Sequence, residues 1–189
     1  LPIWNILIWK LLYKKIDLYL SNSFIHTDYL GLGLGLKNVV TFSNDGEANE
    51  LLSHPIRTQK NEVTFMYGGS LRKGMRVYET LDCVKELKIE GYPIKLIIGG
   101  FGPLKEQIID FVSSDKVLKE IVSFHDAKSW NEIPEIYKKS DVVINLAEWS
   151  PYGGVIYEGV KSGTGIISTK YYNSTRHFIY PNFNGYIVY

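Results

Sequence analysis

The sequence predicts an α/β fold: a Rossmann-like parallel sheet of about six strands with helices on both faces. From residue 62 onward, short runs rich in β-branched and aromatic residues alternate with longer segments whose apolar residues recur every three or four positions. This alternation is typical of βαβ units, in which crossover helices join parallel strands. The chain has 189 residues, of which 45% are hydrophobic and 22% charged, and it is long enough for one core and little more than one domain.

Six segments are predicted strands because each is short, apolar and bounded by turn residues. They are 63–67, 94–98, 121–124, 142–146, 165–168 and 186–188. The helices between them each have one apolar face. Three of these faces are formed by Val77, Leu81, Val84 and Leu87, by Leu104, Ile108 and Phe111, and by Trp130, Ile133 and Tyr137. Ser129 and Glu132 have the spacing of a capping box, which predicts the start of the third helix.

The first part of the chain reads differently and predicts a helix to about residue 15, a strand at 17–20, a short helix and a strand at 38–42. We interpret 1–43 as the remnant of a preceding domain, 44–61 as a linker and 62–189 as the main domain. The linker has little apolar periodicity and contains turn signals such as Asn44-Asp45-Gly46. The glycines at 31, 33 and 35 do not form a GxGxxG motif, and they predict a flexible loop.

The amino terminus begins without Met, so we expect the chain to be a piece of a longer protein. Residues 3–13 are apolar with Trp and Lys mixed in, which fits either a helix in a membrane interface or a helix packed on another domain. No apolar run approaches the roughly 20 residues of a transmembrane helix. The only cysteine is Cys83, which excludes an internal disulfide framework and favours a reducing compartment. A net charge of +1 argues against binding to nucleic acid.

Two loops with paired glycines follow predicted strands, which is where ligands bind in doubly wound sheets. The loop 67–74 leads from a strand into a helix and carries Arg72 and Lys73, so it could hold a phosphate. It lacks the spacing of a P-loop, and a plain glycine turn with surface cations is the alternative. The loop 98–103 has the same strand, turn and helix order, with Pro103 suited to a first helical turn.

A third loop follows the predicted strand at 142–146. Gly153 and Gly154 open a helix whose first N–H groups can bind a diphosphate. Glu158 lies about one turn further on, where a carboxylate can accept hydrogen bonds from a ribose diol. A solvated helix residue is the alternative for Glu158.

In order and spacing these segments resemble the carboxyl-terminal, nucleotide-sugar-binding domain of glycosyltransferase family 4, retaining enzymes with the two-domain GT-B fold. The resemblance extends from about residue 15 to residue 189. The matching segments are KKIDLYLSNSFIHTDYL, VVTFSND, YGGSLRKG, LIIGGFGP, IVSFHD, IYKKSDVVINLAEWSPYGGVIYEGVKSG and NGYIVY. The resemblance implies that 1–43 belong to an acceptor-binding domain and that 62–189 bind the donor.

The resemblance also implies roles for individual residues. Lys73 matches the lysine that holds the distal phosphate of the donor, and Glu158 matches the glutamate that binds the ribose. Diphosphate and sugar contacts fall on the backbone amides of Gly153, Gly154 and Val155. The segment from Phe124 to Asp126 matches the loop after the third strand, where the base lies in the family. For His125 the alternative is an inert histidine in a surface turn.

Two positions depart from the family pattern. Ser150 stands where the family has the first glutamate of an E-x7-E pattern, and the nearest carboxylate is Glu148. Gly69 stands where the family has an arginine, for which Arg72 could substitute. Ser70, in the same loop, is also expected to bind the donor. Either Glu148 is a displaced sugar contact or the site is degenerate.

We therefore expect a retaining glycosyltransferase that moves a sugar from a UDP-, GDP- or ADP-sugar to a hydroxyl of a glycan, lipid-linked or protein acceptor. Lys73, Glu148 and Glu158 are the expected catalytic residues, and neither a cofactor nor a metal is expected. The implied location is the cytoplasm, with peripheral membrane contact through the first domain. The alternative is a nucleotide-binding or protein-interaction module without turnover. A nicotinamide oxidoreductase is disfavoured because neither glycine loop gives GxGxxG followed by an acidic residue.

Overall fold

The computed structural model describes residues 8, 11–13, 16–21, 27–41, 61–126, 132–150, 153–172 and 174–189. The chain divides into two compact units, Leu1–Gly46 and Glu47–Tyr189. Most of the predicted linker at 44–61 lies outside the described residues.

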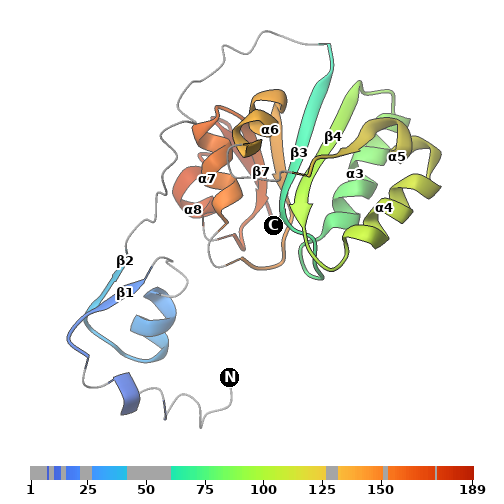
Figure 1. Ribbon diagram of the computed structural model, residues 1–189. Helices are drawn as coiled ribbons and strands as arrows, with labels where there is room; N and C mark the ends of the chain where they lie inside the picture. Colours follow the sequence, from blue (N-terminus) through green and yellow to red (C-terminus); the bar gives the residue numbers. More distant parts are fainter. Residues whose placement is uncertain are drawn as a thin grey trace. The chain divides into compact units, whose positions relative to one another are not determined.

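A six-stranded parallel sheet forms the centre of the larger unit (Figure 1), which confirms the predicted fold class. Its strands are β3 (Val63–Ser70), β4 (Ile94–Phe101), β5 (Val122–Phe124), β6 (Val142–Asn145), β7 (Gly165–Thr169) and β8 (Gly185–Val188). They lie in the order β5-β4-β3-β6-β7-β8. The order reverses between β3 and β6, which is the position where doubly wound sheets bind ligands.

Strands β3 and β4 continue about three residues beyond their predicted ends. Gly68 pairs with Gly99 and Gly69 with Gly100, so the two glycine pairs belong to the sheet ladder. A Cβ at Gly100 would lie 2.3 Å from the carbonyl oxygen of Gly69. The close approach of the two backbones therefore requires glycine, and the turn into each following helix comes later than the sequence pattern suggests.

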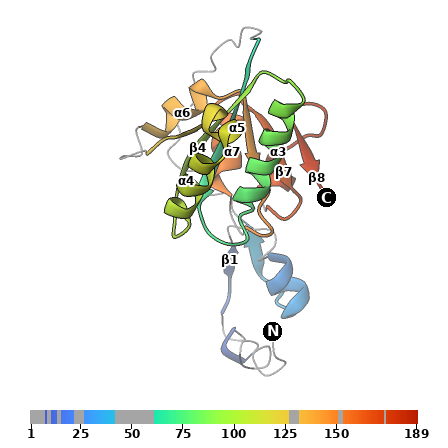
Figure 2. The same cartoon turned by 90° about the vertical axis from the view of Figure 1, so that its right-hand side faces the viewer.

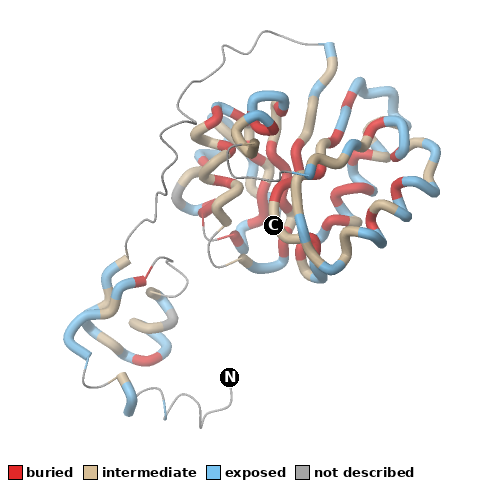
Figure 3. Tube along the Cα trace, in the orientation of Figure 1, coloured by how far each residue is buried: buried red, intermediate tan, exposed pale blue. Residues whose placement is uncertain are grey.

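Helices cover both faces of this sheet (Figures 1 and 2). On one face lie α3 (Val77–Ile89), α4 (Lys105–Ser114) and α5 (Lys116–Ile121), and on the other lie α6 (Ile133–Lys139) and α7 (Gly154–Lys161), with α8 (Thr175–Phe178) beside α7. Buried residues concentrate along the strands and the helix faces turned toward them (Figure 3).

Most of the predicted helix faces are buried as expected. Leu81, Ile108 and Tyr137 are at most 1% exposed. The prediction for Phe111 is wrong: its ring is 41% exposed and packs edge-on against Tyr78, while Val112 takes the buried position. Helix α4 ends at Ser114, and a separate helix, α5, follows it before the third predicted strand.

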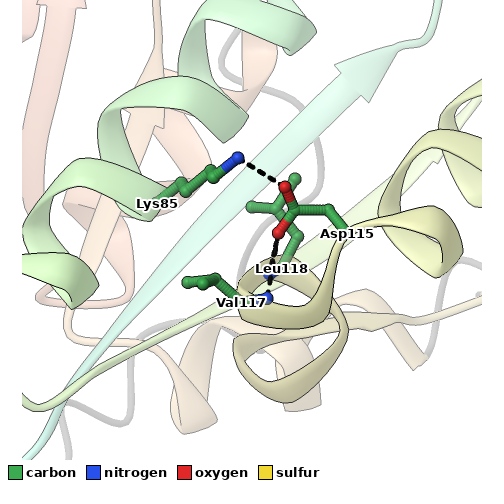
Figure 4. A network of polar contacts seen from close by, with 4 residues as sticks. All are labelled: Lys85, Asp115, Val117 and Leu118. Carbon is green, nitrogen blue, oxygen red and sulfur yellow. Dashed lines mark hydrogen bonds and ion pairs between the residues drawn. The ribbon is translucent and has the colours of Figure 1, made fainter.

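The start of α5 is held by Asp115 (Figure 4). Its carboxylate accepts hydrogen bonds from the amides of Val117 at 2.9 Å and Leu118 at 3.0 Å, which is the arrangement of a side-chain N-cap. The other carboxylate oxygen accepts a hydrogen bond from the ammonium group of Lys85 on α3. The Lys85 ammonium and these amides lower the pKa of Asp115 below its usual value of 3.8. This contact fastens α5 to α3.

Helix α6 begins at Ile133, with Glu132 as its N-cap residue and Pro134 in its first turn. Glu132 makes no side-chain cap hydrogen bond. The predicted capping box falls partly on Ser129, which lies outside the described residues together with Trp130.

The smaller unit contains two short parallel strands, β1 (Tyr19–Ser21) and β2 (Val39–Thr41). Between them lies η1, a π-helix at Tyr29–Gly33. The prediction of a flexible glycine loop here is wrong, because Gly31 and Gly33 are helical and the next leucine, Leu34, is buried. Among the described residues of the chain, no helix is long and apolar enough to cross a bilayer.

Candidate functional site

A cavity of about 650 Å³ opens beyond the carboxyl ends of the strands, at the point where the strand order reverses. Its walls come from the ends of β3 and β4, the start of α4, the segment after β5, and helices α6 and α7. The residues that line it are Met66, Gly68, Gly69, Gly99, Gly100, Phe101, Lys105, His125, Asp126, Ile133, Ile136, Tyr137, Val155 and Glu158. The volume is within the range of small-molecule sites, and the walls are mostly apolar with a few polar groups.

The floor of the cavity depends on the glycines at the end of β3. A Cβ at Gly68 would lie 2.5 Å from Cγ2 of Val155, so glycine lets α7 approach the strand. Gly69 has a φ of +120°, which favours a residue without a side chain. The position that differs from the family's arginine is thus part of the cavity wall itself.

Helix α7 directs its amino terminus toward this region. Gly153 is the N-cap residue with a left-handed φ of +74°, and the helix runs from Gly154 to Lys161. The first amides of a helix have no partner within the helix, so those of Gly154 and Val155 are suited to an anion. Val155 and Glu158 lie one turn apart on the side of α7 that lines the cavity.

Glu158 is oriented by a tyrosine from the neighbouring helix. The hydroxyl of Tyr137 on α6 donates a hydrogen bond to Oε2 of Glu158 at 2.7 Å. Burial of the phenol, together with the negative charge of Glu158, raises the pKa of Tyr137 well above its usual value of 10. The phenol therefore stays protonated and acts as the donor, which leaves the other lone pairs of the carboxylate available to a ligand.

The opposite end of the cavity is also polar. Lys105, the first residue of α4, contacts Asp126 with its ammonium 2.5 Å from the carboxylate. The backbone amide of His125 donates to the carbonyl of Ile98 at 2.9 Å, and its Nε2 is buried with no hydrogen-bond partner among the described residues. Phe124 packs against the core and does not line the cavity. His125 therefore brings a buried, unpartnered ring nitrogen to the wall of the cavity.

The predicted phosphate residues lie in the turn between β3 and α3. Ser70 ends β3, and the side chains of Arg72 and Lys73 that follow are exposed. None of these three lines the cavity as described. The turn is kept in place by Gly74, whose φ is +83° and whose carbonyl accepts a hydrogen bond from the amide of Glu148 at 2.9 Å.

The two residues tied to the E-x7-E pattern lie beside the cavity and not in its lining. The carboxylate of Glu148 is 60% exposed and forms an ion pair with Arg76 at 3.5 Å. Ser150 is half-buried, its side chain lies near the hydroxyl of Tyr172, and the two residues form a backbone bridge. The structure thus brings Gly69, His125, Val155 and Glu158 to one cavity, and it places Glu148 and Ser150 outside the lining.

Sequence reasoning did not predict the roles of Lys105 and Tyr137. Tyr137 was expected only as a buried helix residue. Lys105 follows the second glycine loop at a helix start, a position from which a basic residue could have been proposed for the site. Among the described residues, no group of three or more His, Cys, Asp or Glu side chains could hold a metal ion.

A comparison with known protein families identifies the family of the chain. Residues 49–189 match the family described as glycosyl transferases group 1. The chain belongs to this family. A search among curated proteins finds no match.

Several solved structures are similar in fold to this group 1 chain. Anabaena Alr3699/HepE in complex with UDP matches with a TM-score of 0.79 and 15% identity, over 100% of this chain and 54% of that one. TarM matches with a TM-score of 0.77 and 15% identity, over 93% of this chain and 34% of that one. The C-terminal domain of the group 1 protein LpcC from Francisella tularensis matches with a TM-score of 0.58 and 20% identity, over 67% of each chain. The likeness establishes a shared fold, and this chain spans about a third of TarM and about half of HepE.

Proposed function

We propose that this chain is the donor-binding part of a retaining glycosyltransferase, which transfers the sugar of a nucleoside-diphosphate sugar to an acceptor hydroxyl. The observation that carries the proposal is the position of Glu158 and of the first turn of α7, which face the same cavity at the reversal point of the sheet. A carboxylate one turn from a helix amino terminus matches a ribose linked to a diphosphate.

In the proposed complex the nucleoside occupies the cavity. The ribose hydroxyls donate to Glu158, and the base extends toward His125 and the Lys105–Asp126 pair. The diphosphate lies at the amino terminus of α7, within reach of the cations in the turn after β3. UDP is the first ligand to test because the similar HepE structure was solved with UDP.

The proposed chemistry exchanges one bond at the anomeric carbon. The bond to the diphosphate oxygen breaks, the acceptor oxygen bonds to the same carbon on the same face, and the acceptor hydroxyl passes its proton to the departing diphosphate. Negative charge grows on the leaving diphosphate, where the α7 amides and Lys73 would stabilise it. The proposal includes no covalent nucleophile and no metal. Since acceptor positioning contributes much of such a rate, these 189 residues alone are expected to bind donor without transferring it.

A second candidate is a nucleotide-binding module without turnover. It is favoured by the ion pair between Glu148 and Arg76 and by the contact of Ser150 with Tyr172, since both side chains are engaged outside the cavity. Transfer activity of a longer protein containing this chain, measured with UDP-sugars and an acceptor panel, separates the two candidates.

Calorimetric titration of the chain with UDP, GDP and ADP tests the nucleotide site. We expect one of them to bind and Glu158→Gln to weaken it about tenfold, because the ribose loses hydrogen bonds to a charged group. The matched control is Glu86→Gln, which changes an exposed glutamate on α3, on the other face of the sheet. Absence of binding by all three ligands at about 1 mM, or equal affinity of the Glu158→Gln variant, would refute the proposal.

A further inference from the structure

Tyr172 is a buried tyrosine that the proposed function does not yet use. It lies between β7 and α8, its side chain is 2% exposed, and it does not line the cavity. Its hydroxyl lies near the side chains of Ser150 and Asn145, which both act on its pKa, and Ser150 and Tyr172 also form a backbone bridge. A buried tyrosine hydroxyl beside two polar side chains from other segments is a specific arrangement and not mere core filling.

The ring of Tyr172 packs directly on the N-cap of α7. A Cβ at Gly153 would lie 2.2 Å from Cδ1 of Tyr172, so only a glycine fits beneath the ring. The carbonyl of Gly153 also accepts a hydrogen bond from Oγ of Ser174 at 2.9 Å. The segment after β7 therefore packs against Gly153 and holds it in place at the start of α7.

The hydroxyl of Tyr172 also lies near Asn145, whose side chain contacts the floor of the cavity. Nδ2 of Asn145, at the end of β6, donates to the carbonyl of Gly68 at 2.8 Å, and Gly68 lines the cavity. Burial raises the pKa of Tyr172 to about 12, an effect that Ser150, Asn145 and the positive charge of Arg72 partly oppose. Arg72 thus lies within electrostatic reach of the same phenol, which stays neutral at physiological pH.

We propose that Tyr172 is a positioning residue that sets the amino terminus of α7 against the end of β3, so that the first amides of the helix meet the diphosphate. The inference rests on the proposed function. Tyr172 acts through Gly153, Ser150 and Asn145 and does not touch the ligand. The nucleoside is held by Glu158, one turn further along α7 and fixed by Tyr137 of α6, and by the far end of the cavity, so the effect of Tyr172 falls chiefly on the diphosphate.

The test compares the affinity of UDP with that of uridine in the Tyr172→Phe variant, which keeps the ring and removes the hydroxyl. We expect UDP to bind about three- to tenfold more weakly, the range for a lost polar contact, and uridine to bind within about twofold of the parent. Tyr92→Phe is the matched control, because Tyr92 is 54% exposed at the other end of the sheet.

Ser150→Ala gives a second measurement that does not alter the tyrosine. It should also weaken UDP more than uridine, and the double variant should lose less than the sum of the two, since both changes break one network. Unchanged UDP affinity in both single variants, or equal losses for UDP and uridine, would overturn the role of Tyr172 while the nucleotide site stands. A parent chain that binds neither UDP nor uridine would instead overturn the proposed function together with this inference.

Discussion

The hydroxyl of Tyr137 on α6 donates a hydrogen bond to Oε2 of Glu158 on α7, with 2.7 Å between the two oxygens. The two residues are 21 positions apart in the sequence and come together at the wall of the cavity. Because the Tyr137 phenol is buried and protonated, it fixes one oxygen of the carboxylate and leaves the group facing the ligand space. The carboxylate expected to bind ribose is therefore oriented by α6.

This contact predicts the behaviour of Tyr137→Phe. The variant keeps the ring in the core and removes the donor, so Glu158 becomes less well oriented. We expect both UDP and uridine to bind about three- to tenfold more weakly, since both contain the ribose. Calorimetric titration of both ligands measures the effect, with Tyr78→Phe on α3 as control. A loss confined to UDP would argue against the ribose contact.

Lys73→Ala is expected to change the affinity for UDP and not the affinity for uridine. The ammonium of Lys73 is exposed in the turn after β3, and its proposed partner is the diphosphate. UDP should bind about three- to tenfold more weakly, with a smaller loss at high salt because exposed charges are screened. Uridine affinity should not change. Lys119→Ala on α5, on the far face of the sheet, serves as the control. Equal losses for UDP and uridine would contradict the assignment.

The sheet was predictable from the sequence because each strand is a local apolar run between turn residues. The parallel direction of the strands follows from the crossover helices between them. The ends of β3 and β4 were not predictable from local pattern, since Gly68 and Gly99 pair only after the two strands meet. Gly31 and Gly33 were misread because the burial of Leu34 depends on tertiary packing.

Some residues of the candidate site could likewise be predicted from the sequence, and others could not. Glu158 and the glycines at 153 and 154 stand at a strand end and a helix start, so their positions could be inferred from spacing. Tyr137 and Tyr172 are ordinary helix and loop residues in sequence, and only packing brings them to α7. Asn145 and Gly68, whose hydrogen bond closes the floor of the cavity, are separated by 77 positions.

Glu148 can be tested as a displaced sugar contact. Its carboxylate is 60% exposed and its ion pair with Arg76 is 3.5 Å long, so it can turn toward a bound sugar at little cost. We expect Glu148→Ala to weaken UDP-glucose about threefold or more while UDP stays within about twofold. Competition of both ligands against a fluorescent UDP analogue provides the comparison. Equal affinities of the variant and the parent for UDP-glucose would restrict Glu148 to its contact with Arg76.

The N-cap of α5 allows a prediction about stability and pH. Asp115→Ala removes the cap and the Lys85 contact, and it should lower Tm by about 2–4 °C at pH 7. Asp115→Asn should lose less, because asparagine also caps helices. The folded state lowers the pKa of Asp115 below 3.8, so this stabilisation is present above that pH and is lost as the pH falls through the folded-state pKa. Thermal melts at pH 7, 5 and 3 should therefore show the gap between parent and Asp115→Ala narrowing only at the lowest pH. A gap that stays constant over this range would mean that the ionised carboxylate does not hold α5 to α3.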